Sequence, residues 1–298
     1  MTSPPYCTRN PLLAIVGPTG AGKSELALRI AEQLDGEIVN CDSMQIYRGF
    51  DIGTAKLTLG ERRGIPHHLL DIADATEVFS AGDYAREARL AITGIQERRR
   101  LPIVVGGTGF YLRALLDGLP DLPPRNDCLR ARLEGNPRLH RMLMRLDKRA
   151  AERLHPNDTA RLTRALEIRL LTGRRAPEPA SGAGLTGFAV RKIALFPDRK
   201  ALYAKLDERT EQMFRSGLLE EVRGLLDSGV PVEAKPFQAV GYRQALAVVR
   251  GRMDLEEAIA EAKQATRNYA KRQMTWFRND SGTEHILQFG NNVADFRI

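Results

Sequence analysis

Residues 17–24, GPTGAGKS, fit the pattern G-x-x-x-x-G-K-[ST], which combines glycines, one lysine and one hydroxyl. The glycines let the backbone curl so that its N–H groups point inward onto a phosphate, and Lys23 adds a cation for the terminal phosphates. Ser24 supplies a hydroxyl that can join the shell of a Mg²⁺ ion. The apolar run at 12–16 precedes this segment and a helical pattern follows it, which is the context that the motif needs. We therefore predict binding of a di- or triphosphate, although the motif says nothing about ATP hydrolysis.

A carboxylate, Asp42, follows the next short apolar run, within NCDSMQIYRG. Asp42 has two functional interpretations, as a Mg²⁺ ligand or as a general base, and one structural interpretation, as a helix cap or turn carboxylate. The third apolar run, PIVVGGTG, ends in glycines and Thr108, where a nucleotide hydrolase or kinase would end in aspartate. Thr108 can donate to a phosphate or simply occupy a tight turn. His67 and His68 lack the other ligands of a metal site, and we interpret them as structural.

The elements that must hold these residues alternate along the first third of the chain. Apolar runs within 12–16, 37–43 and 101–106 are typical of strands buried on both faces. Ser80 and Asp83 are spaced as a capping box and open a predicted helix between the second and third strands. Alternation of this kind predicts a parallel α/β sheet, with ligands at the carboxyl ends of the strands.

The alternation stops at LPDLPPRND (119–127), where three prolines interrupt it and a helical, Arg-rich segment begins. RAPEPASGAGLTG (175–187) is rich in Pro, Gly and Ala and predicts a flexible turn or linker. The strand-like segment FAVRKIALFPD then predicts that the sheet resumes. We therefore predict an α/β core at 11–124 and 191–298, interrupted by a helical insertion at 125–190.

Composition narrows the class of protein. The 298 residues are 43% hydrophobic and 28% charged, as in an ordinary globular protein, and no apolar run approaches the roughly 20 residues needed to span a bilayer. The first residues show no signal-peptide pattern, so we expect a cytoplasmic protein without membrane contact. The three cysteines form no CxxC pair, which argues against a zinc site or a disulfide framework. We expect a monomer.

Positive charge is concentrated in two regions. Residues 125–175 hold thirteen Arg and one Lys against six acids, and the chain as a whole has a formal net charge of +8. A second stretch, 263–278, has five basic residues and no acid. One such run is usually a solvated helix face, but two of them beside a phosphate loop favour nucleic-acid binding.

Eight motifs occur in the order typical of tRNA dimethylallyltransferases, also called tRNA isopentenyltransferases, and the chain resembles this family from about Pro11 to Arg278. The motifs are GPTGAGKS, CDSMQIYRGFDIGTAK, PHHLLDI, VGGTGFYLRALLDGLP, HPNDTARLTRALEI, EEVRGLL, VGYRQAL and TRNYAKRQMTWFR. One departure is Gly20-Ala21, where the family usually has Ala-Ser. The resemblance implies a P-loop NTPase-like α/β core, with a mainly parallel sheet flanked by helices, plus a helical insertion domain.

The implied reaction moves a dimethylallyl group from its pyrophosphate to N6 of the adenosine immediately 3′ of the anticodon. The phosphate loop then holds the prenyl donor, and Mg²⁺ is the implied cofactor. By resemblance Asp42 is the general base, while Thr108 and Arg223 join the phosphate loop in holding the pyrophosphate. The loop residues are Gly17, Pro18, Thr19, Gly20, Ala21, Gly22, Lys23 and Ser24, and Ser24 is the implied metal ligand.

The resemblance also implies a surface for the anticodon stem-loop of tRNA. Its residues are Asp42, Ser43, Met44, Gln45, Arg130, Ala160, Arg161, Leu162, Thr163, Arg164, Gln238, Gly241, Tyr242, Arg243, Lys271, Arg272, Gln273, Trp276 and Arg278. Three alternatives stay open from the sequence. A prenyltransferase acting on free adenine nucleotides would not need the basic insertion, a small-molecule kinase would need a strand ending in aspartate, and a non-catalytic RNA-binding protein would not need Asp42 or the phosphate loop.

Overall fold

The chain divides into two compact units. The computed structural model describes residues 10–175, 183–280 and 282–286. The larger unit combines Met1–Leu116 with Leu185–Ile298, and the smaller unit spans Asp117–Gly184. The sequence placed the insertion at 125–190, so the smaller unit begins and ends earlier than expected. Most of the predicted linker at 175–187 lies outside the described residues.

A parallel sheet forms the centre of the larger unit, and its six described strands lie in the order β3-β2-β4-β1-β5-β6. The strands are β1 (Asn10–Val16), β2 (Gly36–Asn40), β3 (His67–His68), β4 (Leu101–Gly106), β5 (Phe188–Leu195) and β6 (Thr283–Ile286). All residues of β2 and β4 are buried, as expected for strands covered on both faces. The predicted parallel α/β sheet is confirmed, but β5 already begins at Phe188, within the range predicted for the insertion.

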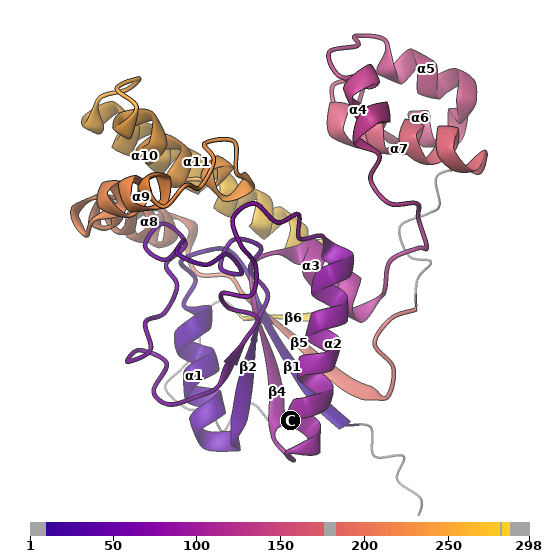
Figure 1. The fold of residues 1–298 in the computed structure, drawn as a ribbon. Coiled ribbons are helices and arrows are strands. Elements are labelled where there is room, and N and C mark those ends of the chain that lie inside the picture. The colour runs from indigo at the N-terminus through magenta and orange to yellow at the C-terminus, as the bar shows by residue number, and fades with distance from the viewer. Residues whose placement is uncertain (1–9, 176–182, 281, 287–298) are drawn as a thin grey trace, which may run out of the picture. The chain divides into compact units, whose positions relative to one another are not determined.

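Helices cover both faces of this sheet, with α1 (Lys23–Leu34) on one face and α2 (Ala81–Glu97) and α3 (Gly109–Leu116) on the other (Figure 1). Leu26 and Ile30 of α1 pack into one buried cluster with Leu13, Ile15 and Ile103 of the sheet. The predicted capping box of α2 is confirmed, because the Ser80 side chain accepts from Asp83 N and the Asp83 carboxylate accepts from Ser80 N.

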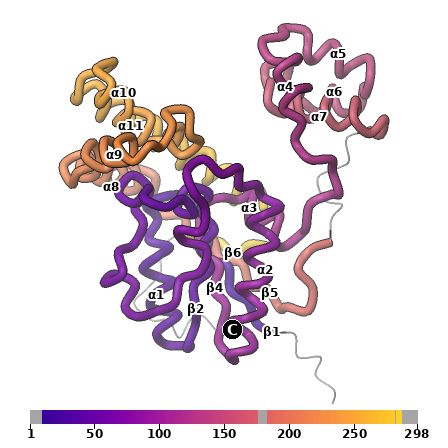
Figure 2. Tube along the Cα trace, in the orientation of Figure 1, coloured from indigo at the N-terminus to yellow at the C-terminus, as the bar shows by residue number. Residues whose placement is uncertain are grey.

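Four further helices and a 3-10 turn complete the larger unit. They are α8 (Arg199–Arg215), α9 (Leu218–Asp227), η1 (Lys235–Gln238), α10 (Tyr242–Val249) and α11 (Leu255–Arg278). The chain trace shows α8 and α9 beside α10 and α11 (Figure 2). Phe50 and Tyr47, from the long loop between β2 and β3, pack into the same buried cluster as Phe237 and Tyr242, so this cluster anchors the loop that carries Asp42.

The smaller unit is helical and has its own core. Its helices are α4 (Asp127–Leu133), α5 (Leu139–Leu146), α6 (Lys148–Arg153) and α7 (Thr159–Thr172). Leu133, Leu143, Leu162 and Leu166 are buried together. No helix in the described part of either unit is long and apolar enough to cross a membrane.

Candidate active site

The phosphate loop joins β1 to α1, and its glycines adopt the left-handed backbone that the motif predicts. Gly17, Gly20 and Gly22 have φ of 132°, 77° and 88°. A Cβ on Gly17 would lie 2.6 Å from the carbonyl oxygen of Leu195 on β5, so only glycine fits there. Gly22 caps α1 without a side-chain hydrogen bond, which leaves the partial positive charge of the helix N-terminus for an anion.

Lys23 begins α1, and its Nζ donates to Pro18 O at 2.7 Å. Burial lowers the pKa of Lys23 to about 8, an effect that Asp42 opposes and Arg209 reinforces. An anion bound in the loop would stabilise the charged lysine. The Ser24 side chain follows it on the exposed first turn of the helix.

Asp42 lies in a turn directly after β2. Its Oδ1 accepts from Met44 N at 2.8 Å, while Asn40 Oδ1 accepts from Asp42 N at 3.1 Å. Asn40 Nδ2 also donates to Leu69 O at 3.0 Å, which ties this turn to the residue that follows β3. The structural interpretation of Asp42 as a turn carboxylate is therefore correct for Oδ1, and the residue also lines a pocket, as a catalytic role requires.

Thr108 joins the loop after β4 to the loop after β2. Its Oγ1 accepts from Ser43 N at 3.1 Å, and its own N–H donates to Cys41 O at 3.1 Å. A Cβ on Gly106 would lie only 2.0 Å from Cys41 O, so the two backbones meet at a point where a side chain has no room. Because β2, β4 and β1 are neighbours in the sheet, the Asp42 turn, Thr108 and the phosphate loop share one edge.

Arg209, on α8, is a residue of this site that sequence reasoning missed. Its Nη2 donates to Thr19 Oγ1 at 2.6 Å, while its buried Nε has no hydrogen-bond partner in the described part of the chain. Burial lowers the pKa of Arg209, an effect that the nearby Asp42 only partly opposes. Arg209 lies outside the sequence motifs. Only the folded structure, which brings α8 to the phosphate loop, shows that it belongs to the site.

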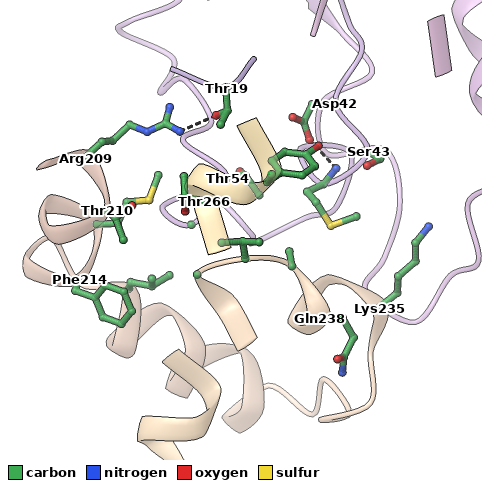
Figure 3. Close-up of a pocket in the computed structure, with 18 of the residues that line it drawn as sticks. Thr19, Asp42, Ser43, Thr54, Arg209, Thr210, Phe214, Lys235, Gln238 and Thr266 are labelled. Atoms are coloured by element: carbon green, nitrogen blue, oxygen red, sulfur yellow. Dashed lines mark hydrogen bonds between the residues drawn. The ribbon is translucent and has the colours of Figure 1, made fainter. Parts of the chain in front are cut away.

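A pocket of about 410 Å³ brings these groups together (Figure 3). Thr19, Asp42 and Arg209 contribute its charged and polar lining, and Figure 3 shows Arg209 reaching Thr19 while Asp42 lies beside Ser43. Its apolar lining includes Phe214 on α8 and four further residues. Those four are Met44, Met213, Leu218 and Val240. A cation, a carboxylate and an apolar surface therefore adjoin one space.

The pocket contains part of the predicted residue set. From that set, the lining residues are Thr19, Asp42, Ser43, Met44, Gln238, Gly241 and Arg272. Arg223 is not among the lining residues. It lies on α9, half exposed, and donates to Glu220 at 2.9 Å. Gln45 Nε2 donates to Thr54 O at 3.0 Å and so stabilises its own loop.

Two side chains predicted to contact tRNA are buried inside the larger unit. Tyr242 is fully buried, donates to Glu221 and accepts from Gly53 N at 3.1 Å. Gln273 is 5% exposed, and backbone groups occupy both ends of its amide. Both side chains therefore pack inside the larger unit, because a motif on a helix does not reveal which face is buried, and their contact with RNA stays a prediction.

The other predicted residues of the larger unit stay closer to the surface. Lys271 and Arg272 are exposed. Arg278 is exposed and lies over the Phe196 ring, with 5.5 Å between Cζ and the ring centroid. Trp276 is half-buried beneath Arg113, and Arg243 pairs with Glu261 at 3.1 Å.

Two predicted tRNA-binding arginines of the smaller unit, Arg130 and Arg164, form hydrogen bonds to a carboxylate within that unit. Glu167 is 0% exposed and accepts from Arg130 Nε and Nη2, each at 3.0 Å, from Arg164 and from Asn126 N. Leu162 is also fully buried and packs in the helical core.

Other predicted tRNA-binding residues of the smaller unit are accessible to solvent. Ala160 and Arg161 are exposed, and Thr163 is half-buried. The Arg161 side chain is 71% exposed and lies 3.4 Å from the Asp158 carboxylate. The motif therefore mixes surface residues with residues of the helical core.

The glycine loop between β1 and α1, on a parallel sheet with helices on both faces, defines a P-loop α/β protein with a helical insertion. Comparison with known proteins assigns the family. The IPP transferase family model matches residues 45–280. The chain is 56% identical to a tRNA dimethylallyltransferase of Solibacter usitatus, over 94% of each chain. It is 47% identical to the same-named protein of Koribacter versatilis, over 95% of this chain and 94% of the other. The chain belongs to the IPP transferase family.

Solved structures are also similar. The tRNA isopentenylpyrophosphate transferase of Bacillus halodurans is 41% identical, with a TM-score of 0.69 over 93% of this chain and 89% of the other. A eukaryotic dimethylallyltransferase acting on tRNA is 32% identical, with a TM-score of 0.77 over 90% of this chain and 70% of the other. The similarity therefore covers both the sequence and the fold.

Proposed function

We propose that the chain transfers a dimethylallyl group from dimethylallyl pyrophosphate to N6 of the adenosine immediately 3′ of the anticodon in tRNA. One observation carries the proposal, because Thr19 of the phosphate loop, Arg209 and Asp42 adjoin one pocket with an apolar lining. Cations for a pyrophosphate and a base for an amine thus lie together. The names of the relatives support the same reaction.

In this reaction the bond between N6 and the allylic carbon forms while the carbon–oxygen bond to the pyrophosphate breaks. The exocyclic amine is a poor nucleophile, so we assign Asp42 as the base that accepts the N6 proton. A positioned base of this kind contributes ~10²–10⁴-fold. The hydrogen bond from Met44 N to Oδ1 orients the carboxylate. The adenosine must leave the base stack to reach it, at a cost of a few kcal/mol.

The pyrophosphate leaves with the electron pair, so negative charge develops at the phosphate loop. We assign Lys23, the loop N–H groups and the Thr108 hydroxyl to its stabilisation. We add Arg209, because it is half-buried, bonded to Thr19 and part of the pocket. The role that the family resemblance gave to Arg223 stays a prediction.

Magnesium fits the donors that the site offers. The described residues contain no group of three or more His, Cys, Asp and Glu side chains that could hold a metal ion. Mg²⁺ suits a site with few protein ligands, because it commonly takes one or two protein oxygens and completes its shell with substrate phosphates and water. Ser24 is the proposed protein ligand, and the bound ion would neutralise pyrophosphate charge.

We propose that tRNA contacts come from exposed residues of both units, including Arg161 in the smaller unit and Lys271 and Arg272 in the larger. In this view the insertion predicted at 125–190 binds RNA, and the core segments 11–124 and 191–298 hold the donor. A monomer in the cytoplasm stays our expectation.

The test follows prenyl transfer from radiolabelled dimethylallyl pyrophosphate, with Mg²⁺, to an anticodon stem-loop RNA and to AMP in parallel. We expect label on the RNA alone. We also expect Asp42→Ala to lose ~10²–10⁴-fold of the transfer rate while still binding pyrophosphate. Label on AMP alone would instead favour a prenyltransferase of free nucleotides. Near-normal transfer by Asp42→Ala would leave that residue with its turn role only.

A further inference from the structure

Gln273 joins three segments that are far apart in the sequence. Its Oε1 accepts from Thr19 N in the phosphate loop at 2.8 Å, and its Nε2 donates to Gly107 O in the turn after β4 at 2.9 Å. The side chain itself belongs to α11 and is buried. One amide therefore fixes the spacing between the phosphate loop, the Thr108 turn and this helix.

The two glycines beside Thr108 make this contact possible. A Cβ on Gly107 would lie 2.2 Å from Gln273 Nε2, and a Cβ on Gly109 would lie 2.0 Å from Trp276 Nε1. Helix α11 thus rests directly on the backbone on both sides of Thr108. Because Thr108 in turn binds Ser43 N, a displacement of α11 would reach the Asp42 turn as well as the phosphate loop.

Tyr269, four residues before Gln273, belongs to the same contact surface. It lines the pocket, and Thr108 is one of its hydrogen-bond partners. Burial raises the pKa of Tyr269, which keeps its hydroxyl neutral. Residues 269, 273 and 276 follow helical spacing, so one side of α11 faces the reacting groups.

The other side of α11 is accessible. Lys271, Thr275 and Arg278 follow the same four- and three-residue spacing and are exposed. This side offers cations to a polyanion, whereas the Gln273 side holds the phosphate loop. A ligand that fixes α11 from outside would therefore also fix the position of the Gln273 amide.

We propose that Gln273 is a positioning residue that couples RNA binding on the exposed side of α11 to pyrophosphate binding in the phosphate loop. The inference rests on the proposed function, in which these two ligands are the substrates. When RNA holds α11 in place, Gln273 holds Thr19 and Gly107 at the spacing that binds pyrophosphate. The coupling must be reciprocal, so each ligand tightens the binding of the other by the same factor.

The experiment is a calorimetric titration of inorganic pyrophosphate with Mg²⁺, without and with saturating anticodon stem-loop RNA. It compares the wild type, Gln273→Met and the control Gln264→Met, an exposed glutamine on the same helix. We expect RNA to tighten pyrophosphate binding between about 5- and 150-fold in the wild type and the control. In Gln273→Met the ratio of pyrophosphate affinities with and without RNA should fall to near one, while the affinity for RNA is kept.

A second variant, Gly107→Ala, reaches the same contact without changing Gln273, since the added methyl displaces its amide. It should lower the ratio in the same way, and it serves as the test if Gln273→Met does not fold. A wild-type ratio of one or less would overturn the inference, as would an unchanged ratio in the folded variants. Wild-type transfer to the stem-loop is measured in parallel, so a failure of the coupling with intact transfer leaves the proposed function standing.

Discussion

The two units bury charged side chains in different ways. In the smaller unit Glu167 is fully buried and accepts hydrogen bonds from Arg130, Arg164 and Asn126 N, so its charge is matched within the fold. In the larger unit Arg209 faces the pocket, makes one hydrogen bond to Thr19, and has a buried Nε without a partner in the described residues.

This difference separates a charge that holds a fold together from a charge that awaits a ligand. For a buried charged group with all its partners, the loss of one partner is costly. A buried cation with donors left over gains most when an anion arrives, as expected where negative charge develops in a reaction. The contrast assigns a structural role to Glu167 and a binding role to Arg209.

The largest effect should come from Glu167→Ala, which leaves Arg130 and Arg164 partly buried without their carboxylate. We expect the smaller unit to lose about 3–5 kcal/mol of its free energy of unfolding. Hydrogen exchange of the α4–α7 amides measures this loss. Glu152→Ala is the matched control, since that carboxylate is 55% exposed and should change stability by less than about 0.5 kcal/mol. Equal losses in both variants would remove the contrast.

Arg209→Gln should lower the rate of prenyl transfer by about 10²–10³-fold, as seen when one donor to a developing negative charge is removed. Its melting temperature should change little, because the guanidinium has only one hydrogen-bonded partner among the described residues. Arg223→Gln is the comparison, and we expect near-normal transfer because that side chain is 51% exposed and pairs with Glu220. A loss confined to Arg223→Gln would return the pyrophosphate role to that residue.

Acid should weaken the smaller unit through Glu167. Burial alone would raise the pKa of this carboxyl, but hydrogen bonds from Arg130, Asn126 N and Arg164 lower it to about 2 from the ordinary 4.5. The folded state thus favours the charged form. This stabilisation, at most about 3 kcal/mol, is present above pH 4.5 and is lost as the pH falls toward 2. Urea denaturation at several pH values measures it, and Glu167→Gln should show a flatter profile.

The smallest effect concerns RNA affinity. Arg161 is 71% exposed, so Arg161→Gln should reduce the slope of log affinity against log salt by about one, as for the loss of one phosphate contact. Arg130→Gln should instead lower the stability of the smaller unit through Glu167. Filter binding of the stem-loop at several salt concentrations, with a melting curve for each variant, separates the two effects. A reduced slope only in Arg130→Gln would reverse the assignment.

Much of the larger unit was predictable because its signals are local. The glycine spacing at 17–24 sets the backbone of the phosphate loop, and buried apolar runs mark β1, β2 and β4. A parallel α/β sheet brings the carboxyl ends of its strands to one edge, so Asp42 and Thr108 were expected at the same edge, and the observed strand order places them after neighbouring strands.

The missed features depend on contacts between distant segments. Arg209 reaches Thr19 across 190 residues, and Gln273 reaches the same residue across 254. Motif letters also do not say which side of a helix is buried, which is why Leu162 and Tyr242 were expected at the RNA surface. A charge count identifies a basic segment but cannot separate Arg130, which is paired with Glu167, from the exposed Arg161.

The larger unit closes on itself where the insertion leaves it. Leu185 N donates to Leu116 O at 3.0 Å, so the two chain ends that flank the smaller unit already meet. Closing a short bridge between ends that are so close costs little chain entropy. The smaller unit is therefore inserted as a module, and a short bridge in its place would leave the flanking ends of the larger unit where they are.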